Sequence, residues 1–180
     1  MSSTAPRSIP TAGLGPLEKV DGHWVIGEPG QKMHVVFKPE GLEAHKDDQE
    51  PWLTPWWRFM GLGVEVTSHR FTSSRLFGLS HHGPMTLQGP RLVGTVRKPY
   101  EMWSAQFSRH RHAYPFQQIV LLQQLLGWST ETGMAERLGD PAWMDSAVAR
   151  LAAVRLHGYR ERRTREAVET ALADISGAQQ

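Results

Sequence analysis

The sequence contains no cysteine, which excludes disulfide bonds, thiolate metal sites and cysteine nucleophiles. It also lacks any apolar run approaching the roughly eighteen residues that a membrane-spanning helix requires. Net charge is small, because 20 Lys and Arg residues are set against 18 Asp and Glu residues. Such a balance excludes a strong global field that would attract nucleic acid. We therefore expect a soluble, cytoplasmic protein without a membrane span.

The length of 180 residues fits one domain with a helical extension. A chain near this size buries about 70% of the surface that its unfolded form exposes, so its core needs no covalent staples. Residues 1–30 hold four prolines and five glycines, with Trp24-Val25-Ile26 as their only apolar anchor. We interpret residues 1–30 as a flexible N-terminal arm.

Residues 31–98 carry the patterns of antiparallel β structure. The segments 34–38 and 42–46 read as two strands around the turn Pro39-Glu40-Gly41, where proline fixes φ near about −65° and glycine is expected to be left-handed. Further short strands are predicted over 51–54, 62–69, 74–79 and 91–97. Short, regularly spaced strands of this kind are typical of a barrel or a sandwich.

From Pro99 onward the apolar spacing changes to that of helices. Tyr100, Trp103 and Phe107 lie at helical intervals behind this proline, which suits a first helical turn. A second helix is predicted from Pro115 because the residues after it form a wide apolar face. Two more are predicted, one after Asp140-Pro141, an N-cap followed by proline, and one after Gly158.

Three segments of the β region share a pattern with a known family: Val35–Leu42, Thr54–Phe59 and Leu62–Val66. Their order, a strand, a turn ending in Gly-Leu, a return strand and a Pro-Trp strand, resembles that of bacterial pleckstrin-homology-like (PH-like) domains. The whole chain also resembles uncharacterised actinobacterial proteins with a Pro-Tyr-Glu-x-Trp segment, here Pro99–Trp103. The resemblance implies an α+β fold, in which a small antiparallel β barrel over 31–112 is capped by a helix. A C-terminal helical module over 113–180 would follow.

One departure from the family concerns lipids. PH domains that bind inositol phosphates place several basic residues around a long first hairpin loop. Here that loop is the short, acidic Pro39-Glu40-Gly41, with only Lys38 and Lys46 beside it. The resemblance therefore does not extend to phosphoinositide binding, and we expect a protein partner or a second copy of the chain.

Two adjacent tryptophans are the first candidates for a partner-binding surface. Trp56 and Trp57 would face opposite sides of a strand, so one belongs to the core and the other points outward. An outward tryptophan is either a binding hot spot or is covered by the arm or the helical extension. Of these, we expect it to be covered.

An arginine-rich segment is the second candidate. It contains Arg155, Arg160, Arg162 and Arg163, which could contact phosphates and so favour a nucleic-acid-associated protein. Acidic residues such as Glu166 are interleaved at helical pairing distances, which favours a salt-bridged, solvent-facing helix instead.

No constellation indicates a reaction, a metal or a cofactor. The clusters His81-His82 and His110-Arg111-His112 have no acidic neighbour in sequence except Glu101, so we expect solvated loop histidines rather than ligands. The acidic run 47–50 lacks the spacing of a calcium loop and is expected to be a solvated turn. We predict a non-enzymatic interaction or scaffolding module, with a nucleic-acid-associated protein and an enzyme of unknown reaction as alternatives.

Overall fold

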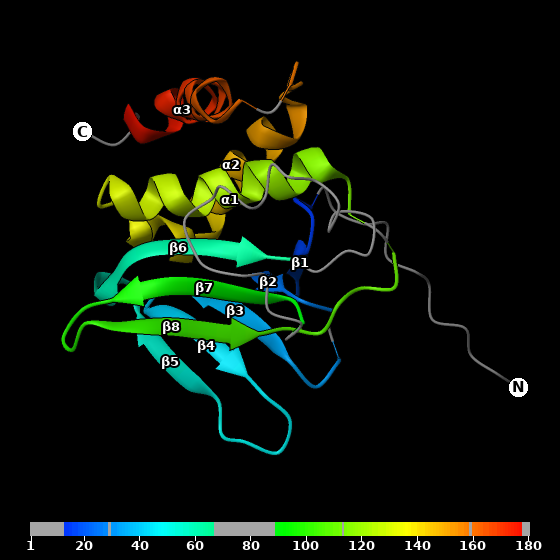
Figure 1. The fold of residues 1–180 in the computed structure, drawn as a ribbon, viewed down its shortest axis with the longest axis vertical. Coiled ribbons are helices and arrows are strands. Elements are labelled where there is room, and N and C mark those ends of the chain that lie inside the picture. Colours follow the sequence, from blue (N-terminus) through cyan, green and yellow to red (C-terminus); the bar gives the residue numbers. More distant parts are fainter. Residues whose placement is uncertain (1–12, 29, 67–88, 113, 159, 178–180) are drawn as a thin grey trace, which may run out of the picture.

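The fold belongs to the α+β class, as predicted. The computed structural model describes residues 13–28, 30–66, 89–112, 114–158 and 160–177. They form a five-stranded and a three-stranded antiparallel sheet together with three α-helices. The helices gather on one side of the strands, with the C-terminal helix farthest from them (Figure 1). None of the described helices has both the length and the apolar character needed to cross a membrane.

The five-stranded sheet, sheet A, follows chain order. Its strands are β1 (Leu17–Val20), β2 (His23–Ile26), β3 (His34–Lys38), β4 (Gly41–His45) and β5 (Trp52–Pro55). The predicted β3–β4 hairpin is confirmed, since Lys38 pairs with Gly41 across the turn. The expectation that Gly41 has a left-handed backbone is wrong. Glycine is required at this position for a different reason, because a Cβ there would lie 2.1 Å from the carbonyl oxygen of Thr54 on β5.

The predicted flexible arm needs a correction over residues 13–28. These residues contain β1 and β2, which pair with each other and join sheet A through β3. The two-residue turn between β1 and β2 is Asp21-Gly22, and both residues have positive φ, at 49° and 85°. Asp-Gly between short strands is a hairpin signal that the glycine and proline content obscured. Residues 1–12 lie outside the described part of the chain.

The three-stranded sheet, sheet B, has the order β6-β7-β8. Its strands are β6 (Phe59–Glu65), β7 (Arg91–Val96) and β8 (Glu101–Gln106), and the 3-10 turn η1 (Trp56–Arg58) connects β5 to β6. The strand expected over 91–97 is confirmed, and the one expected over 74–79 lies outside the described residues. The helix expected after Pro99 is wrong, because this segment is β8. Trp103, Ala105 and Phe107 also alternate with period two, and that pattern prevails.

One core fills the space between the inner faces of the two sheets. Sheet A contributes residues such as Ile26, Phe37 and Leu42, and sheet B contributes residues such as Leu92 and Trp103. Among the described strands no ladder joins the two sheets, so closure into a barrel stays a prediction. Backbone bonds link the segments that follow and precede the strands instead: Ser108 donates to Met33 O at 2.7 Å and accepts from Glu28 N at 3.0 Å.

The three predicted helical segments beyond Pro115 are confirmed. They are α1 (Phe116–Glu131), α2 (Pro141–Ala153) and α3 (Glu161–Gly177), with a 3-10 segment η3 (Ala135–Gly139) before α2. The carboxylate of Asp140 caps α2 by accepting from the backbone amides of Ala142 and Trp143, at 3.0 and 3.2 Å.

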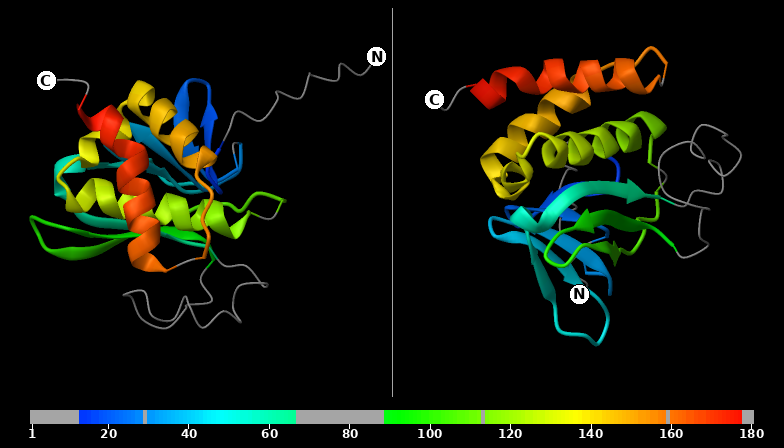
Figure 2. Two further views of the ribbon diagram at one scale, coloured as in Figure 1. Left: turned by 90° about the horizontal axis from the view of Figure 1, so that it is seen from above. Right: turned by 60° about the vertical axis from the view of Figure 1, so that its left-hand side comes forward.

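The helices form two layers over the strands, as the two views of Figure 2 show. In the inner layer, α1 runs along β6, and Asp145 of α2 accepts from the indole of Trp24 at 3.1 Å and from Lys19. In the outer layer, α3 packs on α1 and α2 through Val168 and Leu172, which are fully buried.

Candidate functional site

Trp56 and Trp57, the two candidate tryptophans, both lie in the η1 turn and point in opposite directions. Trp56 points into the core with 2% of its surface exposed, and its indole donates to Lys38 O at 2.8 Å. Trp57 points outward and keeps 47% of its surface exposed. The expectation of opposite directions is confirmed. The expectation that Trp57 is covered is wrong for the described residues, because 47% of its surface stays exposed beside them.

Trp57 lies among other exposed apolar side chains at one end of sheet B, which we call the Trp57 corner: Trp57, Met60, Tyr100 and Met102. Tyr100 is 76% exposed and Met102 65% exposed. Both belong to the β7–β8 hairpin, and the backbone bond from Arg97 N to Arg58 O, 2.9 Å long, holds that hairpin beside η1. Met60 occupies the bulge of β6, next to the row that pairs Gly61, Thr95 and Met102.

Positive charge surrounds the Trp57 corner. The ammonium of Lys98 lies 5.8 Å from the centroid of the Trp57 ring, within the range of a cation–π contact. Arg97 donates from Nε to Trp57 O at 2.7 Å, and Arg58 forms a 2.9 Å ion pair with Glu101. The corner thus combines an aromatic anchor with a cationic rim, which suits an apolar partner segment carrying acidic residues.

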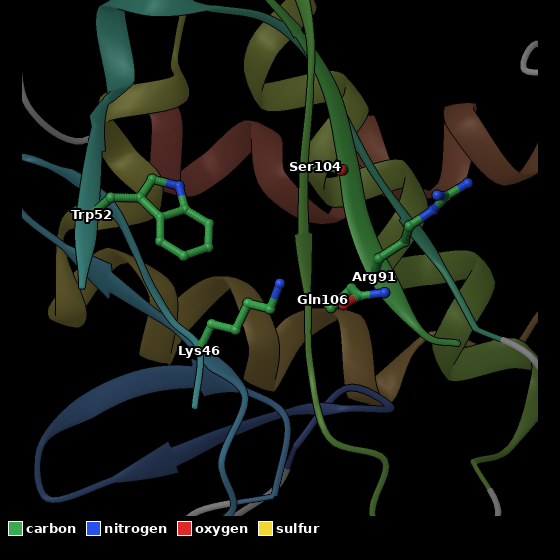
Figure 3. Close-up of a pocket in the computed structure, with 5 residues that line it drawn as sticks. All are labelled: Lys46, Trp52, Arg91, Ser104 and Gln106. Carbon is green, nitrogen blue, oxygen red and sulfur yellow. The ribbon is translucent and has the colours of Figure 1, made fainter. Parts of the chain in front are cut away.

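A shallow hollow adjoins β8 beyond Met102. It has a volume of about 160 Å³ and is lined by Lys46, Trp52, Arg91, Ser104 and Gln106. Figure 3 shows Lys46 and Trp52 on one side of the hollow and Ser104 and Gln106 on the other. Small-molecule sites usually measure about 300–1,000 Å³, so this hollow is smaller than such sites and has room for a side chain.

His110 requires a correction, because it is not a solvated loop histidine. Its ring is buried and is held at Nε2 by Glu18, 2.9 Å away, and at Nδ1 by the hydroxyl of Tyr114, 2.6 Å away. The same hydroxyl accepts from His110 N at 3.0 Å, so Tyr114 contacts both the backbone and the ring of His110. Burial raises the pKa of Tyr114. This network joins β1 to the loop before α1.

A second polar cluster lies on the outer face of sheet A. The rings of His34 and His45 stack at 4.3 Å, and Glu43 accepts from Lys38 and contacts His45 at 2.8 Å. The hydrogen bond from Lys38 lowers the pKa of Glu43, while burial, followed by the charge of His45, lowers the pKa of His34. No group of three metal-ligating side chains occurs among the described residues. His81 and His82 lie outside them.

The arginine-rich candidates lie on the connection to α3 and on its outer face. Arg155, Arg160, Arg162 and Arg163 are all exposed. Arg162 pairs with Glu166 at 3.0 Å, one helical turn away, as the charge pattern predicts. Neighbouring Arg165 bonds Glu169 at 3.0 Å and Glu131 of α1 at 2.9 Å. Part of the positive charge is therefore neutralised within the protein.

Three of the four residues of the Trp57 corner cannot be recognised as candidates from the sequence. Tyr100 fits the helical spacing after Pro99, and exposed methionines such as Met60 and Met102 carry no local signal. The contact between Glu18 and His110 was also missed, since 92 residues separate the two in sequence. When the chain was compared with protein-family models, curated proteins and solved structures, none matched it.

Proposed function

We propose that this chain is a non-enzymatic, protein-binding module that grips its partner at the Trp57 corner. The observation that carries the proposal is the exposure of Trp57, Met60, Tyr100 and Met102 together at one end of sheet B. Clustered aromatic and methionine side chains are the composition of binding hot spots, whereas single exposed apolar residues are ordinary. The core does not need these side chains, because Trp56 fills the interior beside them.

The proposal includes the PH-like barrel expected from the sequence. Two features support it: the inner faces of both sheets share one core, and the backbone bonds of Ser108 to Met33 and Glu28 bring sheet B against sheet A. A long helix, α1, also follows the last strand, as the family pattern requires. A fold alone does not assign a role, so the functional argument depends on the corner.

The partner we propose is a protein segment with an apolar anchor and acidic neighbours. The anchor would pack on Trp57 and Met102, and the acidic groups would face Lys98 and Arg97 at the rim. Charge complementarity of this kind mainly sets specificity and association rate, while the aromatic anchor supplies most of the affinity.

Peptide selection on the full chain tests this proposal. Peptides from a random library displayed on phage are selected on the folded protein, synthesised with a fluorophore and titrated by fluorescence anisotropy. We expect the recovered peptides to combine apolar and acidic residues. Trp57→Ala should weaken their binding roughly thirtyfold, equivalent to about 2 kcal/mol.

Leu53→Ala is the matched control, since Leu53 is 44% exposed but lies opposite Glu43 on the outer face of sheet A. We expect this variant to bind within about twofold of the wild type, which is the usual effect of a contact outside a hot spot. Recovery of no peptides, or of peptides indifferent to Trp57→Ala, would contradict the proposal.

A further inference from the structure

The backbone hydrogen bonds of this fold show which groups point away from each sheet. In an antiparallel pair, the backbone N–H and C=O groups of one residue point at the partner strand, and those of the next residue point away from it. Phe107 N donates to Pro90 O, which continues the β7–β8 ladder, so the alternation along β8 is fixed. Residues 101, 103 and 105 face β7, and Met102, Ser104 and Gln106 point their N–H and C=O groups outward.

Each of the other three sheet edges is closed at one of its outward positions. On β1, Leu17 exchanges both backbone bonds with Leu14, at 3.3 and 2.9 Å. On β5, the outward positions are Leu53 and Pro55, and proline has no N–H to offer. On β6, Val64 N donates to the Gln123 side chain of α1 at 2.7 Å. Proteins block edges in these ways because an open edge pairs with other chains.

The edge of β8 differs because it has two successive outward positions, Met102 and Ser104, that are both open among the described residues. Beyond the strand, Ser108 uses its outward N–H and C=O on Met33 and Glu28 of sheet A. Upstream, the outward groups of Met102 and Ser104 have no backbone partner among the described residues, and no proline or helix covers them there. Met102 also belongs to the Trp57 corner, so this edge is continuous with the proposed docking surface.

The surroundings of this edge indicate its occupant. The hollow beside Ser104 has Lys46 and Trp52 as its opposite wall (Figure 3). A single extended segment fits between β8 and that wall and can place one side chain in a volume of about 160 Å³. The cationic rim of Lys98 and Arg97 at the adjoining Trp57 corner favours a partner segment that carries acidic residues as the occupant.

We infer that an extended segment of the protein partner adds to β8 as a further strand, bonding its backbone to Met102 and Ser104 while its apolar anchor packs on the Trp57 corner. Strand addition of this kind takes affinity from main-chain bonds and specificity from alternate side chains. The inference rests on the proposed function, because it gives the mode in which the same partner binds.

Amide exchange of the wild-type chain provides the first test. The probe is a peptide recovered by the phage selection on the full chain. We expect the amides of Met102 and Ser104 to gain at least about tenfold protection from solvent exchange when the peptide saturates the protein. If the peptide binds in a Trp57-dependent manner while both amides exchange at their free rates, this inference is wrong and the proposed function stands. If no peptide binds, the proposed function fails as well.

N-methylation of the peptide provides a test that leaves the protein unchanged. In a paired strand only every second residue directs its N–H at β8. We expect N-methylation of the alternate peptide residues whose N–H points at β8 to weaken binding about tenfold, the equivalent of a lost hydrogen bond. N-methylation of the intervening residues should change binding by less than about threefold. Equal effects at the two alternating sets of residues would overturn the inference.

A variant of β8 completes the design. Ser104→Pro removes an outward N–H that the β7 ladder does not use, and Ser104→Ala keeps that N–H as the matched control. We expect about tenfold weaker peptide binding for the first variant and a change within about twofold for the second. Sedimentation of the wild type also decides between occupants. A dimer that Ser104→Pro dissociates would assign the edge to a second copy and overturn the inference.

Discussion

The indole nitrogen of Trp103 donates a 3.0 Å hydrogen bond to the hydroxyl of Thr54, across the core that the two sheets share. Both residues are buried, so neither group can exchange its partner for water. Trp103 belongs to β8 and Thr54 to β5, the two edge strands beside the hollow. This bond therefore fixes the position of the β8 edge relative to sheet A.

Replacing Thr54 by valine tests the importance of that link. Thr54→Val keeps the side-chain shape but leaves the indole N–H of Trp103 buried without an acceptor. We expect a loss of about 1–3 kcal/mol in the free energy of unfolding, measured by urea denaturation. Thr95→Val is the control, because the Thr95 hydroxyl contacts only the sulfur of Met102 at 3.9 Å on the outer face. A change below about 0.5 kcal/mol is expected there, and equal effects would contradict the role of Thr54.

The buried network of Glu18, His110 and Tyr114 makes a second stability prediction. Tyr114→Phe removes a hydroxyl that accepts from His110 N and hydrogen-bonds with its Nδ1. Because both groups are buried, we expect a loss of about 1–3 kcal/mol, seen as a lower midpoint of thermal unfolding. Tyr100→Phe is the control, since Tyr100 is 76% exposed. A Tyr114→Phe variant with an unchanged midpoint would show that the network carries no stability.

The histidine pair on sheet A predicts a pH dependence. The folded state lowers the pKa of His34, through burial first and the charge of His45 second. The folded protein therefore binds this proton more weakly than the unfolded chain. The contribution of neutral His34 to the free energy of unfolding is complete above its ordinary pKa of 6.5. This contribution is lost as the pH falls from 6.5 through the lowered pKa of the folded state. We expect the urea midpoint to decrease with acidification in this window.

Substitution of the histidine isolates this effect. His34→Gln should flatten the dependence of the urea midpoint on pH below 6.5. His157→Gln, at an exposed histidine ahead of α3, should leave the wild-type slope unchanged. A slope that survives His34→Gln would assign the pH dependence to other groups.

The blocked edge of β6 can be opened by a single substitution. Gln123→Ala removes the acceptor of Val64 N, so this amide stays under α1 without a partner. We expect a loss of about 1–3 kcal/mol and faster exchange of the Val64 amide, followed by NMR. Gln124→Ala, one residue along α1, is the control. Unchanged exchange at Val64 would mean that backbone packing, and not the glutamine, protects this edge.

Local signals predicted much of the fold. The β3–β4 hairpin and the starts of α1 and α2 follow from short segments, such as Pro39 in the turn and Asp140-Pro141 at the cap. Their conformations are set by neighbouring residues, so the sequence contains the information needed. The strand β8 was mistaken for a helix because Tyr100, Trp103 and Phe107 fit helical spacing as well as partial alternation.

The candidate site was less accessible to prediction. The exposure of Trp57 depends on which side of the sheets the helices cover, and packing over the whole chain decides this. The contact between Glu18 and His110 joins distant segments, and the open edge of β8 depends on which distant segments pack beside that strand. Such properties belong to the tertiary arrangement and leave no local pattern in the sequence.

The contact between η3 and the β3–β4 turn supports the placement of the helices, and Gly139 makes it testable. A Cβ at Gly139 would lie 2.4 Å from Lys38 O and 2.5 Å from the indole nitrogen of Trp56. Those two atoms are the acceptor and donor of the bond that holds Trp56 in the core, so a Cβ at position 139 would press directly on this bond.

We expect Gly139→Ala to lower the free energy of unfolding by about 3 kcal/mol, at the upper end for overpacking, in urea denaturation followed by tryptophan fluorescence. Gly61→Ala is the matched control, because a Cβ there meets no heavy atom within 4 Å. It should change stability by less than about 0.5 kcal/mol. If Gly139→Ala were equally harmless, η3 could not lie against the turn, and Trp56 would not be held from the helical side. The outward direction of Trp57 would then lose its structural cause, because the two tryptophans share one turn of η1.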